Sequence, residues 1–175
     1  MALRYALLAS LLALSLGCDS FPNGTDHAFH WWSCGAADGV SVSAVRPVNP
    51  DGSPQYPVRL DQDLHIAVDL VNNNRVFSKL SLDVTVWTWS GFFKCGWKQI
   101  PTFGLLEDLD ACDMSLTCPL KTGSGPITVK LPFSKYGIII RLLKNNAPYQ
   151  LKYELSDENG NVAYCLMAQT RALTK

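Results

Sequence analysis

The chain has 175 residues, of which 47% are hydrophobic and 17% charged, a balance typical of a globular protein and not of a disordered one. Its 15 Lys and Arg residues are matched by 15 Asp and Glu residues, and no basic cluster stands out, so we expect no nucleic-acid partner. This length suits a single domain with one hydrophobic core.

The N-terminal segment, residues 1–17, is predicted to be a signal peptide. It carries one early basic residue, Arg4, followed by an apolar stretch that is too short to span a bilayer. Cleavage after Gly17 leaves Cys18 as the first mature residue, whereas cleavage after Ser20 removes that cysteine. Residues 18–175 are predicted to form the single domain.

A glycosylation sequon follows the leader at Asn23, where Gly24 and Thr25 complete the motif. N-glycosylation takes place in the secretory compartments, in which disulfides also persist. The leader, the sequon and the six cysteines together predict a protein that enters the secretory pathway.

The rest of the chain is dominated by apolar residues that alternate with polar ones, a period of two that is typical of half-buried strands. Gly, Pro, Asn and Asp separate the runs at short spacings, which favours an all-β, immunoglobulin-like β-sandwich of two antiparallel sheets. Asn159 and Gly160 predict a hairpin turn between the last two strands. Residues 123–125 are expected to form a loop, and only residues 105–109 suggest a short helical turn. The predicted strands are residues 40–43, 64–70, 80–86, 127–131, 136–143, 149–155 and 162–169.

Large aromatic residues crowd one stretch in the middle of the chain, and two interpretations stay open. Aromatic side chains usually complete a core or cover a sheet edge. Alternatively, they border a hydrophobic opening and contact a membrane, because Trp favours the interface between water and lipid. The residues concerned are Trp87, Trp89, Phe92, Phe93, Trp97 and Phe103.

No residue pattern points to catalysis or to a metal. Ser124 lies between two glycines but lacks the flanking residues of a nucleophile elbow. His27 and His30 have no further ligands at a suitable spacing. Acidic pairs such as Asp61 and Asp63 are expected on a solvated face. We therefore predict that the protein is not an enzyme and needs neither cofactor nor metal.

Three motifs occur along the chain in this order: Phe29-His30-Trp31-Trp32-Ser33-Cys34-Gly35, Cys112-x5-Cys118-Pro119-Leu120-Lys121 and Tyr164-Cys165-Leu166. Together they resemble the ML lipid-recognition family, and the resemblance covers residues 29–172. Within that family, the chain is most similar to the ganglioside activator branch in the stretches Trp97-Lys98-Gln99-Ile100-Pro101, Cys118-Pro119-Leu120-Lys121-Thr122-Gly123 and Lys130-Leu131-Pro132.

The resemblance implies two disulfides, Cys34 with Cys165 and Cys112 with Cys118. It leaves Cys95 unassigned. Cys95 pairs with Cys18 if the leader is cut after Gly17; otherwise it is free or competes with Cys118 for Cys112.

The resemblance also implies that the two sheets part at one end and enclose a hydrophobic cavity. A buried acyl chain gains about 0.8 kcal/mol per CH₂ in a bilayer or in a protein, so exchange between the two is nearly balanced, as a carrier requires. The side chains expected to line the cavity are Leu80, Leu82, Val84, Val86, Ile138, Ile140, Leu142, Leu151 and Tyr153.

These expectations predict a secreted or lysosomal lipid-binding or lipid-transfer protein that encloses fatty acyl chains or a sterol, contacts membranes transiently and presents glycolipid. One alternative is an accessory module that binds a hydrolase or a receptor through its surface. The other is an adhesion-type sandwich with a filled core and no lipid.

Overall fold

The computed structural model describes residues 18–35, 39–91 and 94–175, and the predicted signal peptide lies outside them. The strands are β1 (His30–Ser33), β2 (Val40–Val48), β3 (Val58–Arg59), β4 (Leu64–Asn72), β5 (Ser81–Ser90), β6 (Gly96–Gln99), β7 (Leu109–Asp110), β8 (Gly123–Leu131), β9 (Ala147–Ser156) and β10 (Val162–Leu173). The short helical segments are η1 (Pro22–Gly24), α1 (Ala111–Met114), η2 (Phe133–Tyr136) and α2 (Gly137–Leu142).

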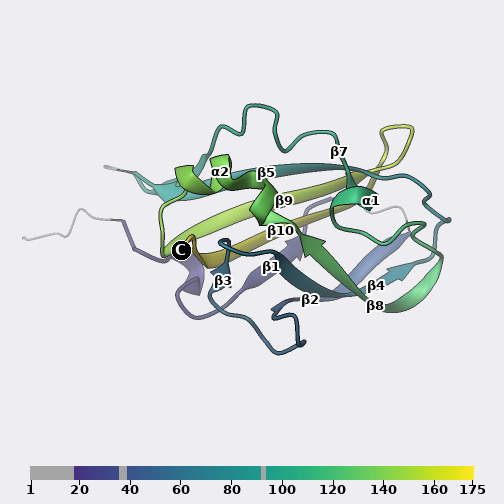
Figure 1. The fold of residues 1–175 in the computed structure, drawn as a ribbon, viewed down its shortest axis with the longest axis horizontal. Coiled ribbons are helices and arrows are strands. Elements are labelled where there is room, and N and C mark those ends of the chain that lie inside the picture. The colour runs from purple at the N-terminus through teal and green to yellow at the C-terminus, as the bar shows by residue number, and fades with distance from the viewer. Residues whose placement is uncertain (1–17, 36–38, 92–93) are drawn as a thin grey trace, which may run out of the picture.

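The strands form two sheets that pack face to face (Figure 1). The larger sheet has the order β1-β10-β9-β5-β6, with β3 also paired to β10 and β7 to β5, and the smaller sheet has the order β2-β4-β8. Every pair is antiparallel except β3 with β10. The predicted all-β sandwich is therefore confirmed.

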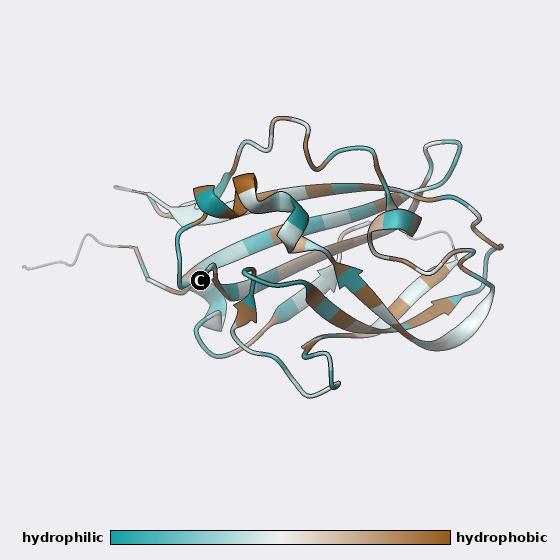
Figure 2. Cartoon of the chain, in the orientation of Figure 1, coloured by the Kyte–Doolittle hydropathy of each residue, from teal (hydrophilic) through white to brown (hydrophobic). Residues whose placement is uncertain are grey.

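Strand β4 shows why the sequence pattern predicts the sheets well. Its residues alternate without a break between buried and half-buried positions, and Leu64, Ile66, Val68 and Leu70 are all buried. Successive side chains of a strand point to opposite faces, so the apolar set faces the other sheet and the polar set faces outward. Figure 2 shows the same alternation as bands of brown and teal along the strands.

The prediction of a strand over residues 136–143 is wrong, because this segment forms the end of η2 and helix α2. Tyr136, Ile139, Ile140 and Leu143 lie three and four residues apart, which is the spacing of one helix face, and all four face the space between the sheets. Ile138 lies on the opposite side of the helix and is 73% exposed. A short apolar run does not distinguish a strand from a helix by its periodicity alone.

Several smaller expectations also need correction. Residues 123–125, expected as a loop, form the start of β8. Residues 103–106 form a turn, and the short helix expected near residues 105–109 begins later, at Ala111. Strands β1, β3, β6 and β7 were not predicted; β3 and β7 have only two residues each, too few for an alternating pattern to show.

The predicted hairpin between β9 and β10 is confirmed. Gly160 has a φ of 78°, which a residue without a Cβ adopts at little cost. Asp157 accepts hydrogen bonds from the backbone N–H groups of Asn159 and Asn161, both at 2.9 Å. These bonds and the nearby Arg75 lower the pKa of Asp157 to about 2, so its carboxylate stays charged and holds the turn.

The chain forms three disulfides, and two of them are the pairs that the resemblance implies. Cys34–Cys165 links the end of β1 to β10, and Cys112–Cys118 closes the loop that carries α1. The third pair, Cys18–Cys95, resolves the open assignment of Cys95. It fixes the N-terminal segment to the loop that precedes β6.

Candidate functional site

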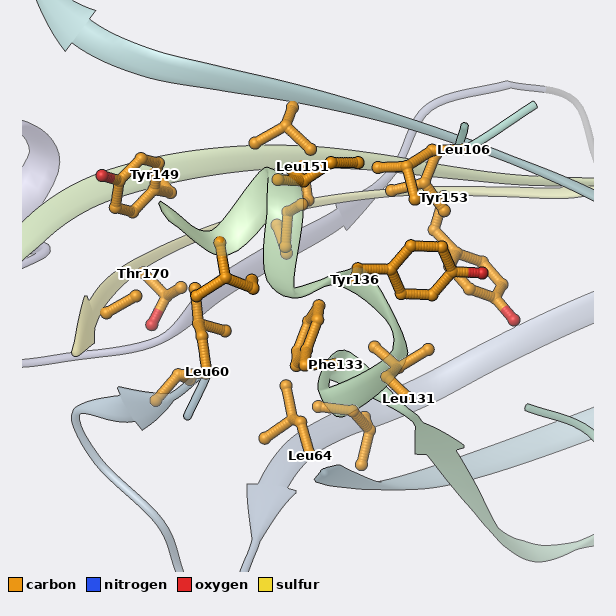
Figure 3. A pocket seen from close by; sticks show the side chains of 18 of the residues that line it. Leu60, Leu64, Leu106, Leu131, Phe133, Tyr136, Tyr149, Leu151, Tyr153 and Thr170 are labelled. Atoms are coloured by element: carbon orange, nitrogen blue, oxygen red, sulfur yellow. The ribbon is translucent and has the colours of Figure 1, made fainter. Parts of the chain in front are cut away.

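A cavity of about 130 Å³ lies between the two sheets, and we call it the main compartment. Inward-facing residues of β5, β9 and β10 form one wall, while β2, β4 and the end of β8 form the other. Segment η2–α2 connects the two sheets and lies across the gap between them, so that it forms a further part of the lining (Figure 3). The lining residues are Phe29, Val45, Val58, Leu60, Leu64, Ile66, Leu82, Val84, Val86, Leu106, Leu109, Met114, Leu131, Pro132, Phe133, Tyr136, Ile139, Ile140, Leu143, Tyr149, Leu151, Tyr153, Leu166, Ala168, Thr170 and Ala172.

Four hydroxyl groups belong to this lining, and each already has a partner. Tyr149 donates to the backbone oxygen of Lys144 at 2.8 Å, and Thr170 donates to the backbone oxygen of Arg171 at 3.1 Å. The Tyr136 hydroxyl lies 3.5 Å from a methionine sulfur, and the Tyr153 hydroxyl lies 2.6 Å from a serine oxygen. The lining therefore presents hydrocarbon and satisfied polar groups to whatever occupies it.

Burial further favours the neutral form of the tyrosines in the lining. Desolvation raises the pKa of Tyr136 and Tyr149. It also raises the pKa of Tyr153 to about 12, although the hydrogen bond with Ser115 opposes this shift. A phenol with a raised pKa stays protonated at physiological pH, so none of these side chains brings a charge into the main compartment.

A second and smaller cavity, of about 70 Å³, lies between the same two sheets, and we call it the second compartment. It is also apolar. Four residues, Val45, Ile66, Tyr153 and Leu166, line both compartments. The others are Val42, Val68, Leu70, Leu116, Ile127, Val129, Leu155 and Tyr164.

The size of the main compartment limits what fits without rearrangement. Its volume of about 130 Å³ is close to that of an engineered apolar cavity, about 150 Å³, that stays dry and binds benzene. The main compartment thus admits a short hydrocarbon segment as it stands. A longer chain needs additional space.

The structure brings six of the nine predicted cavity residues together. Leu82, Val84, Val86, Ile140, Leu151 and Tyr153 line the main compartment. Leu80, Ile138 and Leu142 line neither compartment and need correction. Leu80 is buried elsewhere in the core. Ile138 and Leu142 were placed inward on a strand, but the helix turns both of them outward.

Sequence reasoning missed the residues that η2–α2 and the loops bring to the site. Phe133, Tyr136, Ile139 and Leu143 line the main compartment, as does Leu106 from the loop between β6 and β7. The helical spacing of residues 136, 139, 140 and 143 was the available signal for the first group. No pattern marks Leu106, because a loop residue has no periodicity.

The tryptophans predicted for the cavity rim lie elsewhere. Val84 and Val86 of β5 face the main compartment, so Trp87 and Trp89 face the outer side of the larger sheet. Trp89 pairs across the strands with Trp97 of β6, with ring centroids 5.3 Å apart in an edge-to-face arrangement. This aromatic pair lies on the outer face of β5 and of the edge strand β6, and neither ring lines a compartment. Phe92 and Phe93 lie outside the described residues.

Two segments that border the main compartment also expose apolar side chains. In the loop between β6 and β7, Leu106 faces the compartment while Phe103 and Leu105 are 80% and 47% exposed. In α2, Ile138 and Leu142 are 73% and 58% exposed. We call these four residues the apolar rim. Phe103 also has a φ of 53°, a left-handed conformation that bulky side chains rarely adopt.

The part of the chain that the structure describes contains no cluster of His, Cys, Asp and Glu that could hold a metal ion. Within those same residues, no helix is long and apolar enough to cross a membrane. Asn23, the predicted glycosylation site, is exposed and donates a hydrogen bond from its amide to Gln169 at 2.8 Å. Its glycosylation stays a prediction.

Comparison with known proteins identifies a family. A model of the ML domain matches residues 28–172 of this chain. No curated protein matches.

Three solved structures are similar to the chain, each at low sequence identity. A Niemann-Pick type C2 protein from the Japanese carpenter ant has a TM-score of 0.42 and 10% identity, with 82% of this chain and 98% of that one covered. Chicken MD-1 complexed with lipid IVa has a TM-score of 0.40 and 10% identity, with the same shares covered. The C-terminal domain of wzt has a TM-score of 0.41 and 12% identity, over 85% of this chain and 80% of that one.

Proposed function

Because the chain belongs to the ML domain family, we propose that it binds lipid by enclosing fatty acyl chains between its two sheets and carries them between membranes. The observation that supports this proposal is the main compartment, which is lined by apolar side chains and by hydroxyl groups that already have partners. An acyl chain needs no polar partner inside the protein. The buried hydroxyl of a sterol would need one, so the lining favours acyl chains over sterols.

The apolar rim supports a role for transient membrane contact. Exposed apolar side chains beside a cavity are typical of surfaces that insert into the outer part of a bilayer. Lys135, Arg141 and Lys144 are exposed around the α2 part of the rim, where basic side chains attract anionic lipid. In this arrangement the segments that border the main compartment are also the ones that contact the membrane. An acyl chain can therefore pass directly from the membrane into the main compartment.

The proposal also includes the cellular location of the protein, its branch within the family and its partners. Three disulfides support an oxidising location, secreted or lysosomal. The Cys18–Cys95 bond favours cleavage of the leader after Gly17 over cleavage after Ser20, because only the first cut retains Cys18. The ganglioside activator-like branch, the presentation of glycolipid, and a hydrolase or receptor partner rest on the sequence resemblance alone.

Ala168 offers a direct test of the proposed cavity. Its side chain lines the main compartment, and replacing it with Phe would fill that space with an aromatic ring. We expect Ala168→Phe to lose most of its binding of a fluorescent fatty acid, because the ring occupies the volume that the chain needs. The measurement is a titration of purified protein, with native mass spectrometry to detect lipid that co-purifies.

The neighbouring Met167 provides the matched control. It lies beside Ala168 on β10 but points to the outer face, and it pairs with Trp32 and Lys152 of the adjacent strands. Met167→Phe adds a ring at that face and should bind fatty acid as the unmodified protein does. If neither the unmodified protein nor this control binds the probe, a surface-acting accessory module or an adhesion-type sandwich becomes the better account.

A further inference from the structure

The two compartments occupy one continuous gap between the sheets and are separated by very few side chains. Val45, Ile66, Tyr153 and Leu166 line both of them. Val45 and Ile66 belong to the smaller sheet, while Tyr153 and Leu166 belong to the larger one. The boundary between the two compartments therefore lies at these four residues.

The last residue of α1 and the residues that follow it form another part of the boundary between the two compartments. Met114 lines the main compartment and Leu116 lines the second. Between them, Ser115 lies with its hydroxyl oxygen 2.6 Å from the Tyr153 hydroxyl. Ser115 also donates to the backbone oxygen of Ala111 at 3.4 Å, so by accepting from Tyr153 it leaves both hydroxyl groups satisfied.

This segment is fixed in place independently of Tyr153. The Cys112–Cys118 disulfide closes the loop around it, and the backbone oxygen of Ser115 accepts a hydrogen bond from the Lys130 N–H of β8 at 3.2 Å. A fixed acceptor makes the Tyr153 hydroxyl costly to move, because turning the ring away would break a hydrogen bond inside the protein.

We infer that Tyr153, held by Ser115, is an internal partition that limits the length of the acyl chain the protein accepts. This inference rests on the proposed function. The main compartment holds only a short hydrocarbon segment, and the second compartment adds roughly half as much space again. A chain that fills the first reaches the second by passing the Tyr153 ring, one of the four side chains that line both.

Removing the ring should shift the preferred chain length. Each buried CH₂ contributes about 0.8 kcal/mol, which is roughly fourfold in affinity. In the unmodified protein, affinity for saturated fatty acids from octanoate to stearate should therefore rise and then level off. In Tyr153→Leu the levelling point should move to longer acids, so that the ratio of stearate to octanoate affinity increases about fifteenfold, the gain expected from about two more CH₂ groups at roughly fourfold each. Ser115→Ala should change the ratio in the same direction by a smaller factor.

Two further variants separate this role from a general loss of packing. Val129 lines the second compartment only, so adding Val129→Phe to Tyr153→Leu should fill the opened space and return the ratio to its original value. Tyr56→Phe removes a tyrosine hydroxyl that is hydrogen-bonded to the backbone of Thr25, and Tyr56 belongs to the lining of neither compartment, so it should leave the ratio unchanged.

The outcomes of this series distinguish the two ideas. If the unmodified protein binds none of the acids, the proposed function is contradicted. If it binds them but Tyr153→Leu and Ser115→Ala keep the original ratio, the partition alone is overturned. Thermal unfolding identifies a variant that does not fold; if Tyr153→Leu is such a variant, Ser115→Ala decides the question.

Discussion

Replacing both Cys34 and Cys165 with alanine is expected to lower the free energy of unfolding by about 5 kcal/mol. The two cysteines are 131 residues apart, so their bond closes most of the chain into one loop and restricts the unfolded state strongly. It also joins β1 to β10, and β10 pairs with three strands of the larger sheet, β1, β3 and β9. Chemical denaturation of the two proteins side by side measures the difference.

The Cys112–Cys118 bond is the natural control for loop length. Its cysteines are only six residues apart, and the same relation gives a cost of about 2 kcal/mol when both are replaced by alanine. Equal losses for the two double variants would contradict the explanation by chain entropy. An unchanged denaturation midpoint without Cys34 and Cys165 would show that this bond does not support the fold.

Replacing Phe103 with Asn is expected to slow lipid extraction from membranes about tenfold or more. Burying a side chain of this size in an apolar phase contributes roughly 1.5 to 3 kcal/mol, and Phe103 is the most exposed residue of the apolar rim. Its φ of 53° is a conformation that Asn tolerates better than Phe. The variant should therefore be as stable as the unmodified protein or slightly more stable. A bulky ring kept at a strained and exposed position suggests a function other than folding.

The assay for Phe103 is transfer of a fluorescent fatty acid from phosphatidylcholine vesicles that contain phosphatidylserine. Val76 is the matched control, because it is also an exposed apolar residue, at 46%, but lines neither compartment. Val76→Asn should transfer lipid at the original rate. An unchanged transfer rate for Phe103→Asn would show that the Phe103 ring does not contact the membrane. A loss of stability in that variant would show that the ring contributes to packing instead.

The sheets could be predicted from sequence because their inward faces follow a strict period of two. In β4 every second residue from Leu64 to Leu70 is buried by the opposite sheet, so the pattern of hydrophobicity and the pattern of burial coincide. The hairpin at Gly160 was predictable for a similar local reason, since its backbone conformation needs a particular residue type. Where one local rule decides the structure, the sequence is sufficient.

Helix α2 was not predictable in the same way, because three consecutive isoleucines satisfy a strand and a helix equally well. What distinguishes them is tertiary. The chain must cross from β8 in one sheet to β9 in the other, and a helix that turns Ile139 and Ile140 inward covers the gap on the way. The predicted strand therefore also misplaced Ile138 and Leu142, which the helix exposes.

The cavity itself depends on space that side chains leave unfilled, and sequence does not encode this quantity locally. Val84 and Leu151 would give the same sequence pattern in a solid core as in the wall of a compartment. The outward position of Trp87 and Trp89, by contrast, follows from the alternation that begins at Val84.

The claim on which the account depends is that the space between the sheets admits a hydrocarbon chain. A crystal structure of the protein with palmitate brominated near its methyl end measures this directly, because the anomalous signal of bromine locates the chain. We predict a bromine peak between the two sheets, beside Leu64 and Leu151 of the main compartment. Palmitate bound only at the outer surface, over an interior closed by interdigitated side chains, would contradict the account.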